Sequence, residues 1–147
     1  MTVVEASSFA KGILVRKLSE RAHSRADLAQ ALAKKHVPEE VAAAMLEKFE
    51  SAGLINDEEF ARSWVQSRSL SKGLAQKVLA MELRRKGVDD EISREVLAEL
   101  DPEAERQAAH QLVQRKLRTM GGLDQQVQIR RLVGLLGRKG YAPQVAF

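Results

Sequence analysis

An internal repeat of about fifty residues is the feature of this sequence that most limits its possible folds. Residues 28–41 read LAQALAKKHVPEEV and match residues 79–92, which read LAMELRRKGVDDEI. The same frame returns at residues 132–145, so the offsets are 51 and 53 residues. A repeat of this period is typical of arrays in which each small unit packs mainly against its neighbours.

Hydrophobic periodicity predicts helices in every long segment. Apolar residues recur with helical spacing along residues 60–68 and 109–120, and no segment alternates apolar and polar residues as a strand would. We therefore expect eight helices and a short ninth. The eight are expected near residues 7–22, 25–35, 38–52, 57–71, 74–86, 89–100, 102–119 and 125–139.

Capping residues predict where several helices begin and end. Ser24 with Asp27 has the form of a capping box, and Pro38, Pro102 and Pro143 are expected at first helical positions. The expected stop signals are glycines that can adopt a left-handed conformation, at Gly53, Gly87, Gly140 and the Gly121–Gly122 pair. His36 occupies the position of Gly87 and Gly140 in the first repeat, so that helix is expected to end without the usual glycine.

Three helices for each repeat predict an all-α protein made of tandem three-helix units, elongated and curved. A short amphipathic helix is only marginally stable alone, whereas three such helices can enclose a small hydrophobic core. The expected units are residues 1–55, 56–101 and 102–147. The third helix of the last unit is expected to be incomplete, since the sequence reaches Phe147 soon after it would begin.

Positive charge is concentrated in the last third of the sequence. Residues 1–105 carry 16 basic and 19 acidic side chains, whereas residues 106–147 carry 8 basic side chains and only Asp124 as an acid. The net charge of +7 after residue 105 favours a polyanion or an acidic protein surface as partner. Two alternatives stay open: basic helices can simply keep a protein in solution, and many bases and acids lie near helix ends where the helix dipole favours them.

Cationic side chains of the second and third units are the candidate binding residues. They are Arg68, Lys72, Arg84, Arg85, Lys86, Arg115, Lys116, Arg118, Arg130, Arg131, Arg138 and Lys139.

Residue patterns for catalysis or metal binding are weak. The chain has no cysteine, and its three histidines lack the spacing of a metal site. Adjacent carboxylates at 39–40, 58–59 and 89–90 fall in expected first helical turns, where capping accounts for them. We therefore expect no enzymatic activity, no metal and no cofactor. With no apolar run of membrane-spanning length and no signal peptide, we expect a cytoplasmic protein without a membrane association.

Aromatic residues offer little for gripping nucleic-acid bases. They make up 4% of the chain, and Phe60 and Trp64 share an apolar stripe with Val65, so core packing is the better interpretation. A three-helix unit could also be a helix-turn-helix reader. The second helices lack the Asn, Gln and Arg array that would reach base edges, which leaves non-specific contact with the DNA backbone.

Several motifs resemble the RecX family of bacterial recombination regulators. They are GLINDEEFA at residues 53–61, Trp64–Val65 with Arg68, ELRRKGV at 82–88, RAHSR at 21–25 with Asp27–Leu28, and RKGY at 138–141. The resemblance spans nearly the whole chain. It implies tandem three-helix repeats that lie in the groove of the RecA nucleoprotein filament and inhibit its ATPase, strand-exchange and co-protease activities. It also implies a place in DNA repair, homologous recombination and the SOS response.

The resulting functional prediction is a regulator, expected to be monomeric, whose partners are RecA and the RecA–DNA filament, with weak non-specific DNA contact. The alternative is a non-specific DNA-binding helical protein that acts through its basic third repeat.

Overall fold

Eight α-helices make up the secondary structure of this computed structural model, which describes residues 2–72 and 74–141. The helices are α1 (Val3–Glu20), α2 (Arg25–Lys34), α3 (Glu39–Ser51), α4 (Asp57–Lys72), α5 (Gln76–Arg85), α6 (Asp90–Ala98), α7 (Pro102–Leu117) and α8 (Gln125–Arg138). Those residues include no strand, so the all-α prediction is confirmed. The expected ninth helix and Pro143 lie outside the described residues.

Side-chain caps explain where the helices start. Ser24 accepts a hydrogen bond from the Asp27 amide at α2, as the capping-box pattern predicts, and Pro102 is in the first turn of α7. Two expected starts were wrong. Helix α1 begins at Val3 because the Thr2 hydroxyl accepts a bond from the Glu5 amide. Pro38 is the N-cap of α3 and not its first helical residue, since its backbone is extended, with ψ at 139°.

Three hydrophobic clusters follow one another along the chain. The first cluster joins α1, α2 and α3 around Leu14, Leu28 and Leu32, and the second joins α4, α5 and α6 around Leu79 and Leu83. The third is smaller and consists of Ala75, Ala109, Leu136 and Tyr141. Because Ala75 immediately precedes α5, this third cluster ties α7 and α8 to the end of the second helix group.

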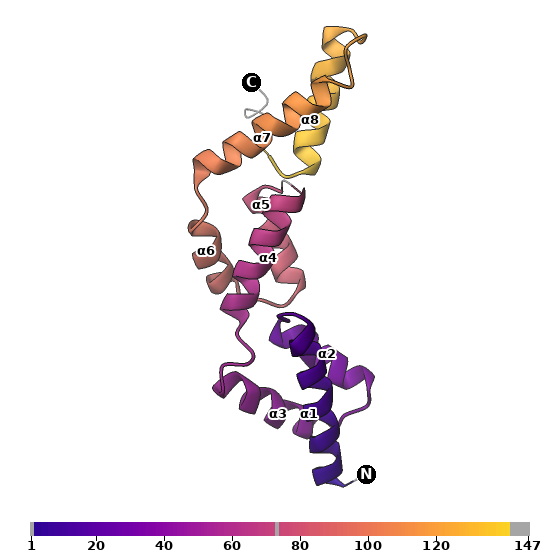
Figure 1. Ribbon diagram of the computed structural model, residues 1–147, viewed down its shortest axis with the longest axis vertical. Helices are drawn as coiled ribbons and strands as arrows, with labels where there is room; N and C mark the ends of the chain where they lie inside the picture. The colour runs from indigo at the N-terminus through magenta and orange to yellow at the C-terminus, as the bar shows by residue number, and fades with distance from the viewer. Residues whose placement is uncertain (1, 73, 142–147) are drawn as a thin grey trace.

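The molecule is elongated and gently curved. Figure 1 shows the α1–α3 group at one end, α4–α6 in the middle and the α7–α8 hairpin at the other end. The accessible surface is 9805 Å², whereas a compact monomer of this mass would expose about 7,500 Å². The excess surface is what an array predicts when each helix group contacts only its neighbours.

Equivalent contacts join successive helix groups at two places, which we call the first and second junctions. At the first junction the N-terminus of α2 meets the C-terminus of α5, and the Ser24 hydroxyl donates to the Lys86 carbonyl at 2.7 Å. At the second junction the N-terminus of α5 meets the C-terminus of α8, and the Ala75 amide donates to the Lys139 carbonyl at 2.9 Å.

At each junction an acidic side chain of the next helix group accepts a hydrogen bond from a backbone amide at the start of a helix. The Arg25 amide donates to Asp57 Oδ1 at 2.9 Å in the first junction. The Gln76 amide donates to Glu105 Oε1 at 3.4 Å in the second. Both amides belong to the first residue of a helix, where the backbone lacks an intrahelical partner. The acids therefore supply hydrogen-bond acceptors to these two amides, and the same bonds link one helix group to the next.

Glycines at the ends of α5 and α8 allow this close approach. Gly87 and Gly140 have φ of +78° and +93°, and a β-carbon built on them would overlap Ala26 and Val78. His36 has the equivalent left-handed conformation, with φ at 63°, at the exposed end of α2. Within the described residues no other helix group packs against this end, so the His36 side chain is exposed and meets no such obstacle.

Candidate binding surface

Three of the predicted cations of the middle helix group form ion pairs within the protein. Arg68 forms an ion pair with Glu82, and its Nε lies 3.1 Å from Glu82 Oε1. Arg84 pairs with Asp90 at 2.7 Å, and Lys86 pairs across the first junction with Asp27 at 3.3 Å. Their charges are therefore partly neutralised before any partner binds.

Trp64 lies at the centre of this group of charges. Its indole N–H donates to Glu82 at 3.0 Å, and its ring lies under the Arg68 guanidinium and the Lys86 ammonium, with centroid distances of 5.4 and 5.0 Å. Phe60 is buried, as the core interpretation predicts, whereas Trp64 is half-buried and packs at the edge of the second cluster. The pKa of the Glu82 carboxyl is lowered, chiefly by its hydrogen bonds with Arg68.

The other candidate cations form no ion pair within the described part of the chain. Arg85, Arg115, Arg118, Arg130, Arg131 and Arg138 are exposed, and Lys116 and Lys139 are half-buried. Lys72 is in α4, but its side chain lies outside what the structure describes. All but one of the unpaired side chains belong to α7, α8 or the residues that follow these helices. The unpaired candidate cations are therefore concentrated at one end of the molecule.

Four of these cations line one concave surface between α7 and α8, which we call the α7–α8 groove. The groove has a volume of about 590 Å³ and is lined by Lys116, Val127, Arg130, Arg131, Gly134 and Arg138. Gly134 contributes no side chain to its floor. The Arg138 guanidinium lies over this glycine, because a β-carbon there would be 3.3 Å from Nη1.

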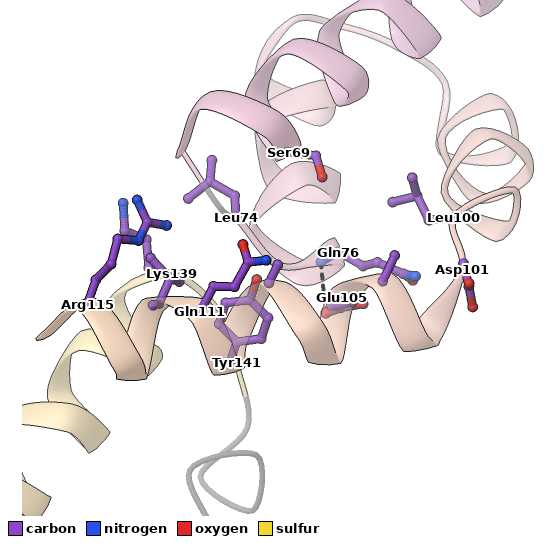
Figure 2. A pocket seen from close by; sticks show the side chains of 13 residues that line it. Ser69, Leu74, Gln76, Leu100, Asp101, Glu105, Gln111, Arg115, Lys139 and Tyr141 are labelled. Atoms are coloured by element: carbon purple, nitrogen blue, oxygen red, sulfur yellow. Dashed lines mark hydrogen bonds between the residues drawn. The ribbon is translucent and has the colours of Figure 1, made fainter. Parts of the chain in front are cut away.

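A second concavity, which we call the junction pocket, lies where α7 passes the middle helix group. Its volume is about 400 Å³, and Figure 2 shows Arg115 and Lys139 together at one end of it. Leu100 and Asp101 lie at its other end, and the Gln76–Glu105 hydrogen bond lies between the two ends. Its walls combine apolar side chains with amides and charges of both signs.

The junction pocket contains residues that the sequence interpretation did not select. Gln76, Glu105 and Tyr141 come from three separate segments, and none belongs to a motif that marks a site. Burial raises the pKa of the Tyr141 hydroxyl, and the nearby Glu105 carboxylate raises it further. The repeat frame is the one sequence signal for this meeting, because it places residue 75 at the position of Ser24 and residues 139–141 at the positions of 86–88, which meet at the first junction.

Within the described residues no group of histidine and carboxylate side chains has the arrangement of a metal site. None of the described helices is long and apolar enough to cross a membrane.

The fold and its charges define a class: a helical array of two three-helix groups followed by an α7–α8 hairpin that carries most of the unpaired candidate cations. Two family models match the chain, the RecX second three-helix domain over residues 56–97 and the RecX first three-helix domain over residues 10–49.

Similar proteins agree with these matches. The regulatory protein RecX of Mycolicibacterium smegmatis is 47% identical over 142 residues, which cover 94% of this chain and 76% of that protein. That of Streptomyces coelicolor is 46% identical over 137 residues, with 93% and 73% covered. The chain belongs to the RecX family of regulatory proteins.

A solved structure supports the fold. The crystal structure of RecX from Lactobacillus salivarius superposes with a TM-score of 0.87 over 97% of this chain and 93% of that one, at 19% sequence identity. The array therefore follows the architecture of a solved member of the family.

Proposed function

We propose that this protein binds the RecA recombinase and its nucleoprotein filament and mainly inhibits recombinase, ATPase and co-protease activity. The observation that carries the proposal is membership of the RecX regulatory family across both matched three-helix domains. On this proposal the protein is a regulator and not an enzyme, acts in the cytoplasm as a monomer, and takes part in DNA repair and homologous recombination.

The shape of the molecule supports binding to a filament. A RecA filament has a helical groove, and a long curved array can contact more than one RecA subunit in it, whereas a compact protein of this size would reach fewer. Linked helix groups that bind neighbouring subunits also gain from high effective concentration. Weak contacts spread along the array can therefore add up to stable binding.

A pull-down against purified RecA tests the proposal. It is run with and without single-stranded DNA and a non-hydrolysable ATP analogue, beside an assay of DNA-dependent ATP hydrolysis. We expect retention that increases when the filament is assembled, together with a lower rate of hydrolysis. The proposal is wrong if the protein neither binds assembled filament nor changes the rate.

The alternative, a protein that binds DNA non-specifically through its basic third unit, is tested by the same ATPase assay at increasing concentrations of DNA. Inhibition that is relieved by excess DNA favours this alternative, because sequestration of DNA would then explain the loss of activity. Inhibition that persists favours direct contact with RecA.

A further inference from the structure

We infer that a surface of the first helix group receives the acidic first turn of a helix that belongs to a RecA subunit. The inference rests on the proposed function and names one contact through which the array holds the filament. We call this surface the Phe9 surface. It encloses a volume of about 380 Å³ and is lined by Ser8, Phe9, Gly12, Ile13, Arg16 and Lys35.

The repeat relates the Phe9 surface to the side of the middle helix group that forms the first junction. An offset of 51 residues takes Ile13 to Trp64, and the same offset takes Lys35 to Lys86. At the junction Lys86 lies over the Trp64 ring and pairs with Asp27, in the first turn of α2. That side of the middle group therefore already binds the acidic first turn of a helix. On the corresponding side of the α1–α3 group, the described part of the chain supplies no further helix group (Figure 1).

Phe9 provides apolar area for a partner on this uncovered side. Phe9 is 42% exposed, whereas Phe60, its counterpart in the repeat, is 4% exposed and lies 5.9 Å from the Trp64 ring. Because the smaller Ile13 stands at the position of Trp64, the first group does not cover its own phenylalanine in the same way. An exposed aromatic side chain beside a buried aliphatic one is a suitable centre for a protein contact.

Positive charge on the Phe9 surface favours an acidic partner. Arg16 and Lys35 are exposed, neither forms an ion pair in the described part of the chain, and no acid lines the surface. The start of a helix carries partial positive charge, so two cations repel it unless its first turn brings carboxylates. Asp27 of α2 meets this requirement at the first junction. The helix that fits the Phe9 surface therefore carries an acid in its first turn.

End-to-end stacking of a second copy is opposed by charge. Such stacking would extend the array by placing the start of α8 of one molecule on the Phe9 surface of the next. The repeat puts Arg131 of α8 at the position that Asp27 has in α2. Arg131 would meet Arg16 and Lys35, and like charges that face one another destabilise an interface. A different protein is therefore the better occupant.

Small residues determine where on this surface the partner helix lies. His36 stands at the position of Gly87, where a β-carbon would overlap Ala26 of α2. The partner helix therefore cannot approach the end of α2 as closely as α2 approaches the end of α5. Gly12 opens the neighbouring part of the surface, since a β-carbon built there meets no atom within 4 Å. The partner helix accordingly lies over α1, between Phe9 and Arg16.

A pair of charge variants tests the cations of the surface. Arg16→Gln/Lys35→Gln removes both of them. Lys11→Gln/Lys48→Gln is the matched control, because it removes two exposed lysine charges of the same helix group outside the surface. Binding to RecA filament, assembled on single-stranded DNA with a non-hydrolysable ATP analogue, is measured by titration. We expect affinity on the order of ten-fold weaker for the surface variant than for the control.

A second pair blocks the surface without removing a cation. Gly12→Glu places a carboxylate between Phe9 and Arg16. Val15→Glu gives the same net charge at an exposed position of α1 outside the surface. Glutamate is a better helix former than glycine, so weaker binding of Gly12→Glu would not reflect a lost helix. Gly12→Glu should bind the filament more weakly than Val15→Glu, and circular dichroism checks that both stay helical.

Cross-linking identifies the acid on the partner. A carbodiimide joins lysine amines to carboxylates that already touch them, and mass spectrometry locates the joined residues. We expect Lys35 to be linked to a carboxylate in the first turn of a RecA helix, in higher yield than Lys11 or Lys48.

The outcomes separate this contact from the proposed function. If the wild type binds the filament and the surface variants bind as tightly as their controls, the contact is wrong and the proposed function stands. If the wild type does not bind the filament, both are wrong. Single-stranded DNA alone could bind with the same dependence on Arg16 and Lys35, which would make the partner a nucleic acid. An oligomer seen by analytical ultracentrifugation and lost in Gly12→Glu would make it a second copy. Either result overturns the inference.

Discussion

Gly87, like Gly140, has two separate requirements for glycine. Its φ of +78° lies in the left-handed region, and a β-carbon at this position would overlap Ala26 of the preceding helix group. Gly53 has almost the same φ, +77°, but a β-carbon there would meet no atom within 4 Å. A comparison of Gly87 with Gly53 therefore separates the cost of backbone strain from the cost of packing at the first junction.

Replacement of each glycine by alanine measures that difference. Gly53→Ala should cost about 1–2 kcal/mol through its left-handed conformation alone. Gly87→Ala should cost this amount and a further ~1–3 kcal/mol from overpacking. Urea denaturation followed by circular dichroism gives both values. Equal losses for the two variants would show that α2 and α5 do not pack closely in solution.

The left-handed glycine was predictable from the sequence, but its close approach to Ala26 was not. Gly87 follows a basic helix end and precedes a capping acid, which are local signals. Ala26 lies 61 residues earlier and carries no signal of its own. The start of α1 is a different case, because Thr2 and Glu5 have the spacing of a capping box that could have indicated Val3 as the first helical residue.

At the scale of helices, the ion pair between α4 and α5 determines which cations are available to a partner. Arg68 and Trp64 of α4 both bind the Glu82 carboxylate of α5, whose side chain is 15% exposed. Composition alone treats Arg68 as equal to Arg130, since the sequence does not show which cation meets an acid. Helix packing makes the difference between a structural cation and a free one.

Substitution Glu82→Gln should lower stability at neutral pH by ~1–2 kcal/mol, because it removes the charge that binds Arg68 while the amide oxygen still accepts from Trp64. The pKa of Glu82 is lowered in the folded protein. Its stabilising effect is therefore present above its unfolded pKa of about 4.3 and is lost as the pH falls through the lower folded value. The wild-type advantage should narrow as the pH approaches and passes below about 4.

Urea unfolding between pH 7 and pH 3.5, followed by the fluorescence of Trp64, the single tryptophan, measures this dependence. Glu99→Gln is the control, since Glu99 also pairs with an arginine, Arg62, but has half of its side chain exposed. Solvent screens such a pair, so its loss should matter less. A difference between wild type and Glu82→Gln that does not change with pH would contradict the role assigned to the Glu82 charge.

The whole molecule is shaped by its two junctions, each of which uses a few hydrogen bonds and one close backbone approach. Elongation was predictable because a repeat of about fifty residues implies stacking of neighbours. The direction of stacking was not predictable from the sequence. It depends on which helix ends meet, and those ends are more than sixty residues apart in the sequence. The location of the α7–α8 groove likewise depends on how two helices cross.

Small-angle X-ray scattering tests the shape directly. A compact chain of 147 residues would have a radius of gyration of about 15 Å. The elongated array of Figure 1 should give a clearly larger value, together with an asymmetric distance distribution. The variant Gly87→Ala should broaden that distribution if the first junction loosens while each helix group stays folded. A wild-type value near 15 Å would mean that the helix groups fold back on one another.

The distinction between paired and free cations leads to a prediction for RecA regulation, which rests on the proposed function. Alanine pairs at Arg115 with Arg118, and at Arg130 with Arg131, should weaken inhibition of RecA ATP hydrolysis without a change in helicity. These side chains are exposed and unpaired in the described part of the chain, and exposed substitutions change stability by only about ±0.5 kcal/mol. Arg68→Ala should instead lower the melting temperature, since it leaves the Glu82 carboxylate without its main partner.

Replacement of exposed acids provides the control for this charge dependence. Glu39, Glu47 and Glu95 are exposed and form no ion pair in the described part of the chain, so their change to alanine should leave inhibition nearly unaltered. Inhibition by the wild type should also weaken as salt rises, because free surface charges are screened over about 10 Å at 0.1 M salt. Inhibition that resists salt, survives the arginine pairs and disappears with the acids would place the RecA interface on the acidic helices, because only that surface would then carry the interaction.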